Sequence, residues 1–198
     1  MVAQLLHKRQ NFTYADYAQI DDDLRRELIH GELLMAPAPG TFHQSLATKL
    51  TMRIAWHVEK KNLGVVFAAP TDVILSQENT VQPDILFISK DRKDVIQPHA
   101  IVGSPDLIVE IISPGSIERD RYVKRDLYEQ AGVREYWMVD PANRSVEVLV
   151  IEEGEYRLAS FASQGERVVS TVVEGLKISL DEIMPNDKSS GDRVNEES

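Results

Sequence analysis

Hydrophobic and polar residues alternate in distinct patterns along the first third of the chain. Thr13 followed by Asp16 resembles a capping box and predicts a short helix that continues through residue 20. Residues 27–35 (ELIHGELLM) then predict a hairpin that turns at His30-Gly31. These short elements precede the first strongly periodic segment of the chain.

A long helix is predicted to begin near His43. Its hydrophobic face is formed by residues at three- and four-residue spacing, namely Ala47, Leu50, Ile54 and His57, broadened by Leu46 and Val58. The tripeptide Asn62-Leu63-Gly64 supplies residues that commonly terminate helices.

From residue 64 onward the hydrophobic period falls from about 3.6 to about 2, which predicts strands. The predicted strands cover residues 64–69, 72–76, 81–88, 106–113 and 135–140. The segment 107–112 (LIVEII) is almost entirely apolar, so we expect it at the centre of a sheet that is covered on both faces.

A second helix is predicted over residues 118–131, between the last two of these strands. Val123, Leu127 and Ala131 form its expected buried line, and Gly132 follows it as a terminating residue. Hairpin turns near Asn143-Arg144 and Glu153-Gly154 and a short helix at 180–184 complete the chain. The order of elements predicts a mixed α/β sandwich.

Composition narrows the class of protein. The chain has 198 residues, 42% of them hydrophobic, and no cysteine, which excludes disulfides, cysteine zinc sites and a thiol nucleophile. We expect one domain over residues 1–185, a disordered polar tail over 186–198, no membrane span and a cytoplasmic location. The formal net charge of -10 argues against a protein that coats DNA through a large basic surface.

Two acidic residues lie in or beside apolar strands, where an unpaired carboxylate is costly. Glu110 lies between Val109 and Ile111, and Asp84 begins another strand segment. Two carboxylates on neighbouring strand ends repel each other unless a cation lies between them, and oxygen ligands without cysteine favour Mg²⁺ or Mn²⁺. The alternative is that each carboxylate pairs with an Arg or Lys, or lies at a solvated strand end.

Lys124 is the third candidate residue. Asp120, Lys124 and Tyr128 follow one another at four-residue spacing on the second helix, so they share one side of it. A helix that returns over the sheet would let the Lys124 ammonium stabilise a phosphate or orient a water molecule. The alternative is an ordinary surface pair of Asp120 and Lys124.

A resemblance to a known family rests on three segments, 82–86 (QPDIL), 104–114 (SPDLIVEIISP) and 131–141 (AGVREYWMVDP), together with Lys124 and Tyr128. They resemble the Uma-type restriction endonuclease family, once catalogued as a domain of unknown function, within the PD-(D/E)XK nuclease superfamily. The resemblance continues upstream through residues 27–33 (ELIHGEL) and His43.

The resemblance implies a restriction-endonuclease-like α/β fold with an αβββαβ core, a mixed central sheet flanked by helices, and extra hairpins at both ends. It implies catalytic roles for Asp84, Glu110 and Lys124, with Asp84 and Glu110 as metal ligands, assisted by the Ile111 carbonyl. His43 and Glu27 also match family positions. The superfamily lysine is expected two residues after Glu110, where this chain has Ile112; Lys124 matches the displaced family position.

The function implied is metal-dependent hydrolysis of DNA phosphodiester bonds with Mg²⁺ or Mn²⁺, carried out by a homodimer. The basic residues between 119 and 125 could neutralise DNA phosphates, or could form an ordinary solvated face. Trp56, Tyr136 and Trp137 lie where core packing or a subunit interface is favoured over base stacking. The alternative function is a non-catalytic binding or regulatory module built on a nuclease scaffold.

Overall fold

The computed structural model describes residues 11–22, 24–36 and 38–184. The polar tail predicted over 186–198, and the outer limits of the predicted domain, lie outside the described residues. Among the residues described, every helix is too short or too polar to cross a membrane.

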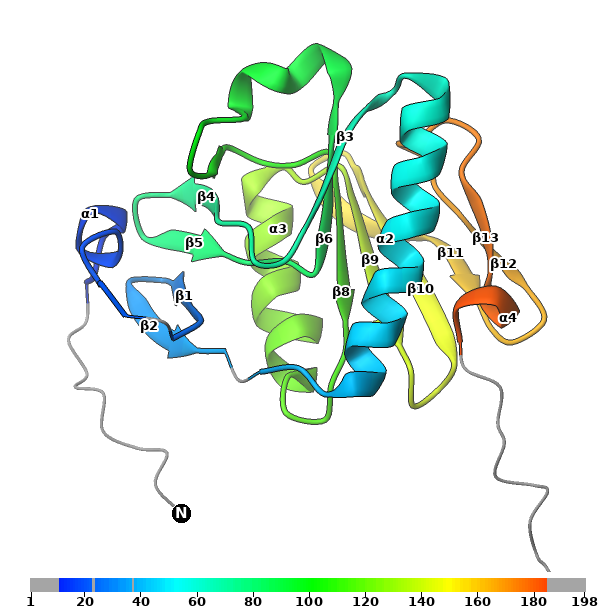
Figure 1. The fold of residues 1–198 in the computed structure, drawn as a ribbon, viewed down its shortest axis with the longest axis horizontal. Coiled ribbons are helices and arrows are strands. Elements are labelled where there is room, and N and C mark those ends of the chain that lie inside the picture. Colours follow the sequence, from blue (N-terminus) through cyan, green and yellow to red (C-terminus); the bar gives the residue numbers. More distant parts are fainter. Residues whose placement is uncertain (1–10, 23, 37, 185–198) are drawn as a thin grey trace, which may run out of the picture.

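A six-stranded mixed sheet forms the centre of the structure (Figure 1). Its strands, in spatial order, are β11 (Glu155–Ala162), β10 (Ser145–Glu152), β9 (Glu135–Asp140), β8 (Leu107–Ile111), β6 (Ile85–Ser89) and β3 (Gly64–Ala68). β8 and β9 are parallel, and the other neighbouring pairs are antiparallel. The intervening helix between β8 and β9 gives the parallel pair the crossover that it requires. The expected αβββαβ order is therefore present.

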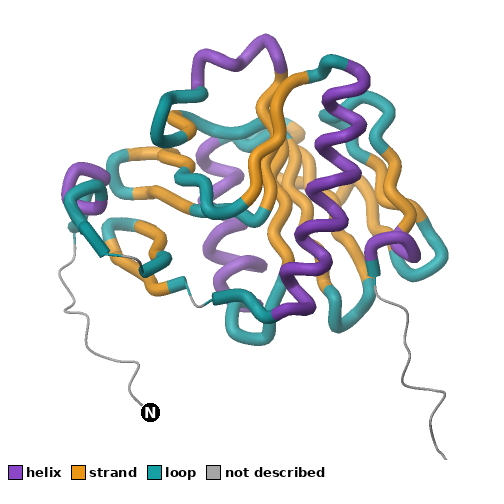
Figure 2. Tube along the Cα trace, viewed as in Figure 1, coloured by secondary structure: helices purple, strands orange, loops and turns teal. Residues whose placement is uncertain are grey.

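Helix α2 (Thr41–Lys61) covers one face of this sheet, as Figures 1 and 2 show. Its buried residues recur every fourth position, and they are Leu46, Leu50, Ile54 and Val58. The helix ends at Asn62, whose φ of 52° is left-handed, as predicted for this terminator. It begins two residues before His43. The predicted stripe member His57 is only half-buried, and its ring bonds the Glu174 carbonyl oxygen (2.9 Å).

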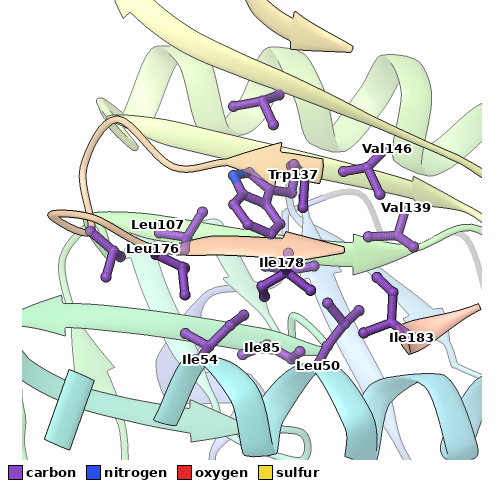
Figure 3. Packing of buried hydrophobic residues seen from close by; sticks show 14 of the residues in the cluster. Leu50, Ile54, Ile85, Leu107, Trp137, Val139, Val146, Leu176, Ile178 and Ile183 are labelled. Carbon is purple, nitrogen blue, oxygen red and sulfur yellow. The ribbon is translucent and has the colours of Figure 1, made fainter. Parts of the chain in front are cut away.

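The apolar strand β8 alternates between two hydrophobic clusters, as its period of two requires. Leu107, Val109 and Ile111 face α2, whereas Ile108 and Ile112 face the opposite side. Figure 3 shows Leu50 and Ile54 of α2 packed toward Ile85 and Leu107 of the sheet. The central, doubly covered position expected for this strand is confirmed.

The opposite face carries a π-helical turn η2 (Arg119–Lys124), helix α3 (Arg125–Ala131) and a smaller sheet. The smaller sheet has five strands in the order β2 (Glu32–Met35), β1 (Arg26–Ile29), β5 (Asn79–Val81), β4 (Val73–Ser76) and β7 (Ile101–Val102). β1 and β2 form the predicted hairpin, with positive φ at His30 and Gly31. This sheet brings residues of the N-terminal hairpin next to the segment that follows β8.

The remaining elements extend the sheet and close its α2 side. β10 and β11 form the predicted hairpins, with positive φ at Arg144, Glu153 and Gly154. β12 (Arg167–Val169), β13 (Lys177–Ser179) and α4 (Leu180–Ile183) pack beside α2. A 3-10 helix η1 (Lys90–Val95) follows β6, and α1 (Tyr14–Tyr17) opens the described chain.

Two predicted boundaries and one predicted burial pattern are wrong. The strand predicted over 81–88 is two strands in different sheets, because the chain leaves β5 and enters β6 through Gln82-Pro83-Asp84. The first short helix ends at Tyr17 rather than at residue 20. In the second helix, Val123 and Ala131 are only half-buried, because the π-helical turn shifts burial toward Lys124 and Tyr128.

Replacement of Leu50 by alanine tests the packing of α2 on the sheet. Leu50 is 0% exposed, so the cavity should lower the free energy of unfolding by about 2–5 kcal/mol, measured by chemical denaturation. Met52 lies on the same helix and is 66% exposed, so Met52→Ala should change that free energy by less than about 0.5 kcal/mol. Equal losses in the two variants would contradict this orientation of α2.

Candidate active site

A cleft of about 150 Å³ opens between the N-terminus of α2, the start of β6, the end of β8 and the η2 turn. All five candidate residues from the sequence line it, namely Glu27, His43, Asp84, Glu110 and Lys124. They come from five separate chain segments and from both sheets. The structure therefore brings the candidates together, whereas their catalytic roles stay predictions.

Asp84 and Glu110 face each other across two neighbouring strands. In the antiparallel pair of β6 and β8, Ile85 is opposite Val109 and Leu86 is opposite Ile108. Extending this register by one residue places Asp84 opposite Glu110. Residues at opposed positions project from the same face of a sheet, so both carboxylates point into the cleft.

The Asp84 carboxylate is held by two donors. Its Oδ2 accepts a hydrogen bond from the Ile111 backbone N–H (2.8 Å) and lies 3.1 Å from His43 Nε2. The hydrogen bond with Asp84 raises the pKa of His43 above its ordinary value, against the lowering effect of burial, so the imidazolium form is favoured. His43 therefore orients Asp84 from the first turns of α2.

Lys124 connects two further carboxylates. Its Nζ lies 2.8 Å from Glu110 Oε1 and 2.8 Å from Glu27 Oε1, while Asp120 Oδ1 is 4.0 Å away. The Lys124 side chain is only 4% exposed, so the surface pair with Asp120 considered from the sequence is wrong. The ammonium instead links β1 of the smaller sheet to β8 of the central sheet.

Tyrosines fix the position of this ammonium. The Tyr128 hydroxyl donates to Glu110 Oε1 (2.7 Å), and the Tyr136 hydroxyl donates to the Asp120 backbone carbonyl (3.0 Å) within the π-helical turn. The two rings meet edge to face with centroids 5.1 Å apart. Both side chains are fully buried. Tyr136 belongs to β9, so its hydrogen bond fixes the turn that carries Lys124 to the central sheet.

The two carboxylates bound to Lys124 have opposite pKa shifts. Burial raises the pKa of Glu110 to about 8; Lys124 lowers it, but the charges of Asp84, Asp120 and Glu27 add to the rise. Burial also acts to raise the pKa of Glu27, but the charge and hydrogen bond of Lys124 outweigh it and lower that pKa. Burial would lower the pKa of Lys124, but the surrounding carboxylates raise it, so the ammonium stays charged.

The free oxygens in the cleft fit a divalent cation. Both hydrogen bonds to Glu110 reach Oε1, and both donors to Asp84 reach Oδ2. Across the described ranges, Glu110 Oε2 and Asp84 Oδ1 accept no hydrogen bond from the protein, and no three His, Asp or Glu side chains form a metal site by themselves. Mg²⁺ commonly takes one or two carboxylates and completes its shell with water and phosphate, so these two residues suit it.

Several residues of the cleft escaped sequence reasoning. Gln82 donates its backbone N–H to Glu27 Oε1 (2.9 Å), and its side chain accepts from Arg25 Nε (3.3 Å). Arg25 follows a run of acidic residues and carries no motif, so its position in the cleft depends on how the hairpin of β1 and β2 docks. Gln82 could have been noticed, since it stands beside Pro83-Asp84 in the segment that carries the resemblance.

The basic cluster between residues 119 and 125 is not one surface. Lys124 is buried, and Arg121 turns away from the cleft to Asp140 (2.9 Å) and Glu147 (2.7 Å). Arg119 alone among the four basic residues shares the cleft with Lys124. The four residues therefore form neither one phosphate-neutralising surface nor one ordinary solvated face, and only Arg119 and Lys124 stay candidates for contact with a phosphate.

The three aromatic residues singled out from the sequence have different environments. Tyr136 and Trp137 are 0% exposed in the core, as favoured from their strand positions. Trp56 is 63% exposed on α2, with the Lys60 ammonium 4.6 Å from its ring centroid. Core packing is therefore excluded for Trp56.

The fold and the cleft together define a restriction-endonuclease-like α/β protein. The family model for Uma2, described as "Putative restriction endonuclease", matches residues 13–181. The chain belongs to this family, which confirms the resemblance found in the sequence.

A solved structure has the same architecture. A protein from Anabaena variabilis ATCC 29413, described as "a putative nuclease belonging to DUF820", superposes with a TM-score of 0.71 at 18% sequence identity. The match covers 86% of this chain and 96% of that one. At this identity the likeness establishes the fold alone. No curated protein matches the chain.

The opposed pKa shifts predict opposite pH dependences of stability for two isosteric variants. The ordinary pKa of Glu110 is 4.5, and burial raises it to about 8 in the folded protein. Between these two pH values the natural chain loses stability as pH rises, because Glu110 ionises more readily in the unfolded chain. Glu110→Gln lacks this loss, so its free energy of unfolding should rise relative to that of the natural chain over the same range. Glu27 contributes stability above 4.5 that is lost as pH falls, so Glu27→Gln should be less stable than the natural chain at pH above 7, with a difference that shrinks in acid.

The measurement is chemical denaturation of the natural chain and both variants at several pH values between about 3 and 9, because the raised pKa of Glu110 acts between 4.5 and about 8, whereas the lowered pKa of Glu27 acts below 4.5. Each variant keeps an oxygen that can accept from Lys124, so the comparison isolates charge. A Glu110→Gln protein that loses stability relative to the natural chain as pH rises would contradict the raised pKa.

Proposed function

We propose that the protein is a metal-dependent endonuclease that hydrolyses phosphodiester bonds in DNA. The observation that carries the proposal is the joint placement of Asp84, Glu110 and Lys124 in one cleft, with carboxylate oxygens left free beside a buried ammonium. Membership of the restriction endonuclease family supports a nuclease, and the donor set supports a divalent cation.

Asp84, Glu110 and the Ile111 carbonyl would hold Mg²⁺ or Mn²⁺. Such an ion, when bound, lowers the pKa of a coordinated water and offsets charge that develops on the phosphate. The backbone N–H of Ile111 and the ring of His43 keep Asp84 pointed into the cleft. Glu27 holds Lys124 beside Glu110, so the positions of both ligands are set before substrate arrives.

The Lys124 ammonium has one N–H group that can donate to the substrate. An ammonium carries three N–H groups, and Glu27 and Glu110 occupy two of them at 2.8 Å each. Asp120 Oδ1, at 4.0 Å, is too distant for a hydrogen bond. The remaining N–H is available for the attacking water or a phosphate oxygen, which is the role that the superfamily assigns to its lysine.

A homodimer would place two such clefts on two DNA strands, which a double-strand cut requires. A non-catalytic binding module remains the second candidate. Two observations favour it: Ile112 occupies the ordinary lysine position, and Glu110 Oε1 is already satisfied by Lys124 and Tyr128. The two functions share the cleft and differ in whether the bond is broken.

Metal binding tests the ligand assignment. Isothermal titration with Mn²⁺ should show binding that weakens by at least about 10-fold in Glu110→Ala, because a carboxylate ligand is lost. Asp126→Ala is the control, since that carboxylate is 61% exposed on α3 and contacts Arg125 rather than the cleft. Unchanged affinity in Glu110→Ala would remove the metal assignment.

Cleavage of supercoiled plasmid tests the activity. The natural chain should nick or cut the plasmid with Mg²⁺ or Mn²⁺, and Lys124→Gln should be slower by about 10²–10³-fold because a donor to the reacting phosphate is lost. Circular dichroism must show that Lys124→Gln is folded, since it leaves two buried carboxylates without a counter-ion. Equal cleavage by an Asp84→Asn, Glu110→Gln double variant would expose contamination and leave the binding module standing.

A further inference from the structure

Four carboxylates and three permanently cationic side chains line the cleft. Lys124 is engaged by Glu27 and Glu110 at hydrogen-bond distance. The other two cations are Arg25 and Arg119, and neither makes a short contact with a carboxylate within the described ranges. The proposed mechanism uses neither of them.

Arg119 is close to two carboxylates without bonding them. Its Nε lies 3.9 Å from Asp120 Oδ1 and 4.0 Å from Glu27 Oε2, whereas charge-assisted hydrogen bonds of this kind measure about 2.7–2.9 Å. Both Arg119 Nε and Glu27 Oε2 are buried without a hydrogen-bond partner among the described residues. Burying a guanidinium nitrogen in this way is costly unless a ligand satisfies it.

Arg25 enters the same cleft from the residue before β1. Its Nε donates to Gln82 Oε1 (3.3 Å), a neutral acceptor, and the Gln82 backbone N–H holds Glu27. Arg25 is half-buried, and its guanidinium makes no ion pair with a described residue. The two arginines therefore line the same cleft as Glu27, Arg119 at 4.0 Å from Glu27 Oε2 and Arg25 through Gln82.

Unpaired polar atoms gather in this cleft. Three of the residues that line it each bury a side-chain nitrogen or oxygen that has no hydrogen-bond partner in the described part of the chain, namely Glu27, His43 and Arg119. Of these atoms, the Arg119 Nε–H is a donor that an anionic ligand can satisfy, whereas Glu27 Oε2 is an acceptor and needs a donor such as water.

We propose that Arg25 and Arg119 form a phosphate-binding subsite that holds the nucleic-acid backbone beside the reacting phosphodiester. The inference rests on the proposed function, since it places a flanking phosphate next to the bond that the metal site would cleave. A guanidinium presents paired donors that match two oxygens of a phosphate, and its charge persists at every pH of interest.

Steady-state cleavage of a defined oligonucleotide tests the subsite. Arg25→Ala and Arg119→Ala should each raise KM about tenfold and leave kcat within about twofold, because a flanking contact is made equally in the ground and transition states. Arg119→Lys should recover part of the loss, since it restores charge without the paired geometry.

Matched controls exist on the same elements. Arg121 is two residues from Arg119 and similarly exposed, at 27% against 25%, but it is paired with Asp140 and Glu147 outside the cleft. Arg26 follows Arg25 and is paired with Asp22 at 2.8 Å. Arg121→Ala and Arg26→Ala should leave KM unchanged, even where they lower stability.

Binding measured without cleavage separates this inference from the proposed function. In a Glu110→Gln background with Mg²⁺, fluorescence anisotropy of a labelled duplex should show Kd raised about tenfold by Arg119→Ala. The slope of log Kd against log salt concentration should fall by about one for each DNA phosphate that the variant no longer neutralises. Arg121→Ala should change neither quantity.

Each outcome decides the subsite. Cleavage by the natural chain with KM and salt slope unaffected by Arg25→Ala and Arg119→Ala would overturn the subsite and leave the nuclease standing. Equal losses in Arg119→Ala and Arg121→Ala would also overturn it, because general charge would then be the cause. Binding that depends on Arg119, in a natural chain that cleaves nothing, would support the subsite and overturn the nuclease. Absence of both binding and cleavage would overturn both.

Discussion

The structure around the cleft depends on one buried ammonium shared by two carboxylates. Lys124 contacts Glu110 of the central sheet and Glu27 of the smaller sheet. It lies in the η2 turn, so one residue of this turn contacts both sheets. Removing either partner from such a buried group leaves an uncompensated charge, which costs about 3–5 kcal/mol. The same contact thus holds two sheets together and positions the proposed metal ligand.

In this arrangement, protein stability and the proposed function place conflicting demands on Glu110. A carboxylate with a pKa of about 8 is destabilising when ionised, yet an ionised oxygen is what a divalent cation binds. Glu27, with its lowered pKa, compensates by keeping Lys124 charged in place. A cleft that concentrates unpaired polar atoms and like charges lowers the stability of the protein without its ligand, and it is typical of a ligand-binding site.

Family membership and cleft geometry support each other but concern different questions. The family match identifies a restriction-endonuclease-like chain, whereas the geometry shows how Lys124, on the element that follows β8, reaches Glu110. Helix η2 returns over the sheet and delivers Lys124 to the same face of β8 from which Glu110 projects. Arg119, one turn earlier, then reaches the cleft from the same element.

The local elements and most of the candidate residues follow from the amino-acid pattern alone. Periodicity identified α2, β8, β9 and the hairpins. Asp84 and Glu110 stood out because an acidic residue in or beside an apolar strand is costly unless it is paired, whereas Lys124 was found from its four-residue spacing with Asp120 and Tyr128 and from the family resemblance. Which charges meet depends instead on how the elements pack in three dimensions. This packing splits residues 81–88 between two sheets, separates Arg119 from Arg121, and brings Arg25 into the cleft. The physical reason is that the local pattern of hydrophobic and polar residues determines burial and backbone geometry, whereas the pairing of charges that are distant in the sequence depends on how helices and strands pack against one another.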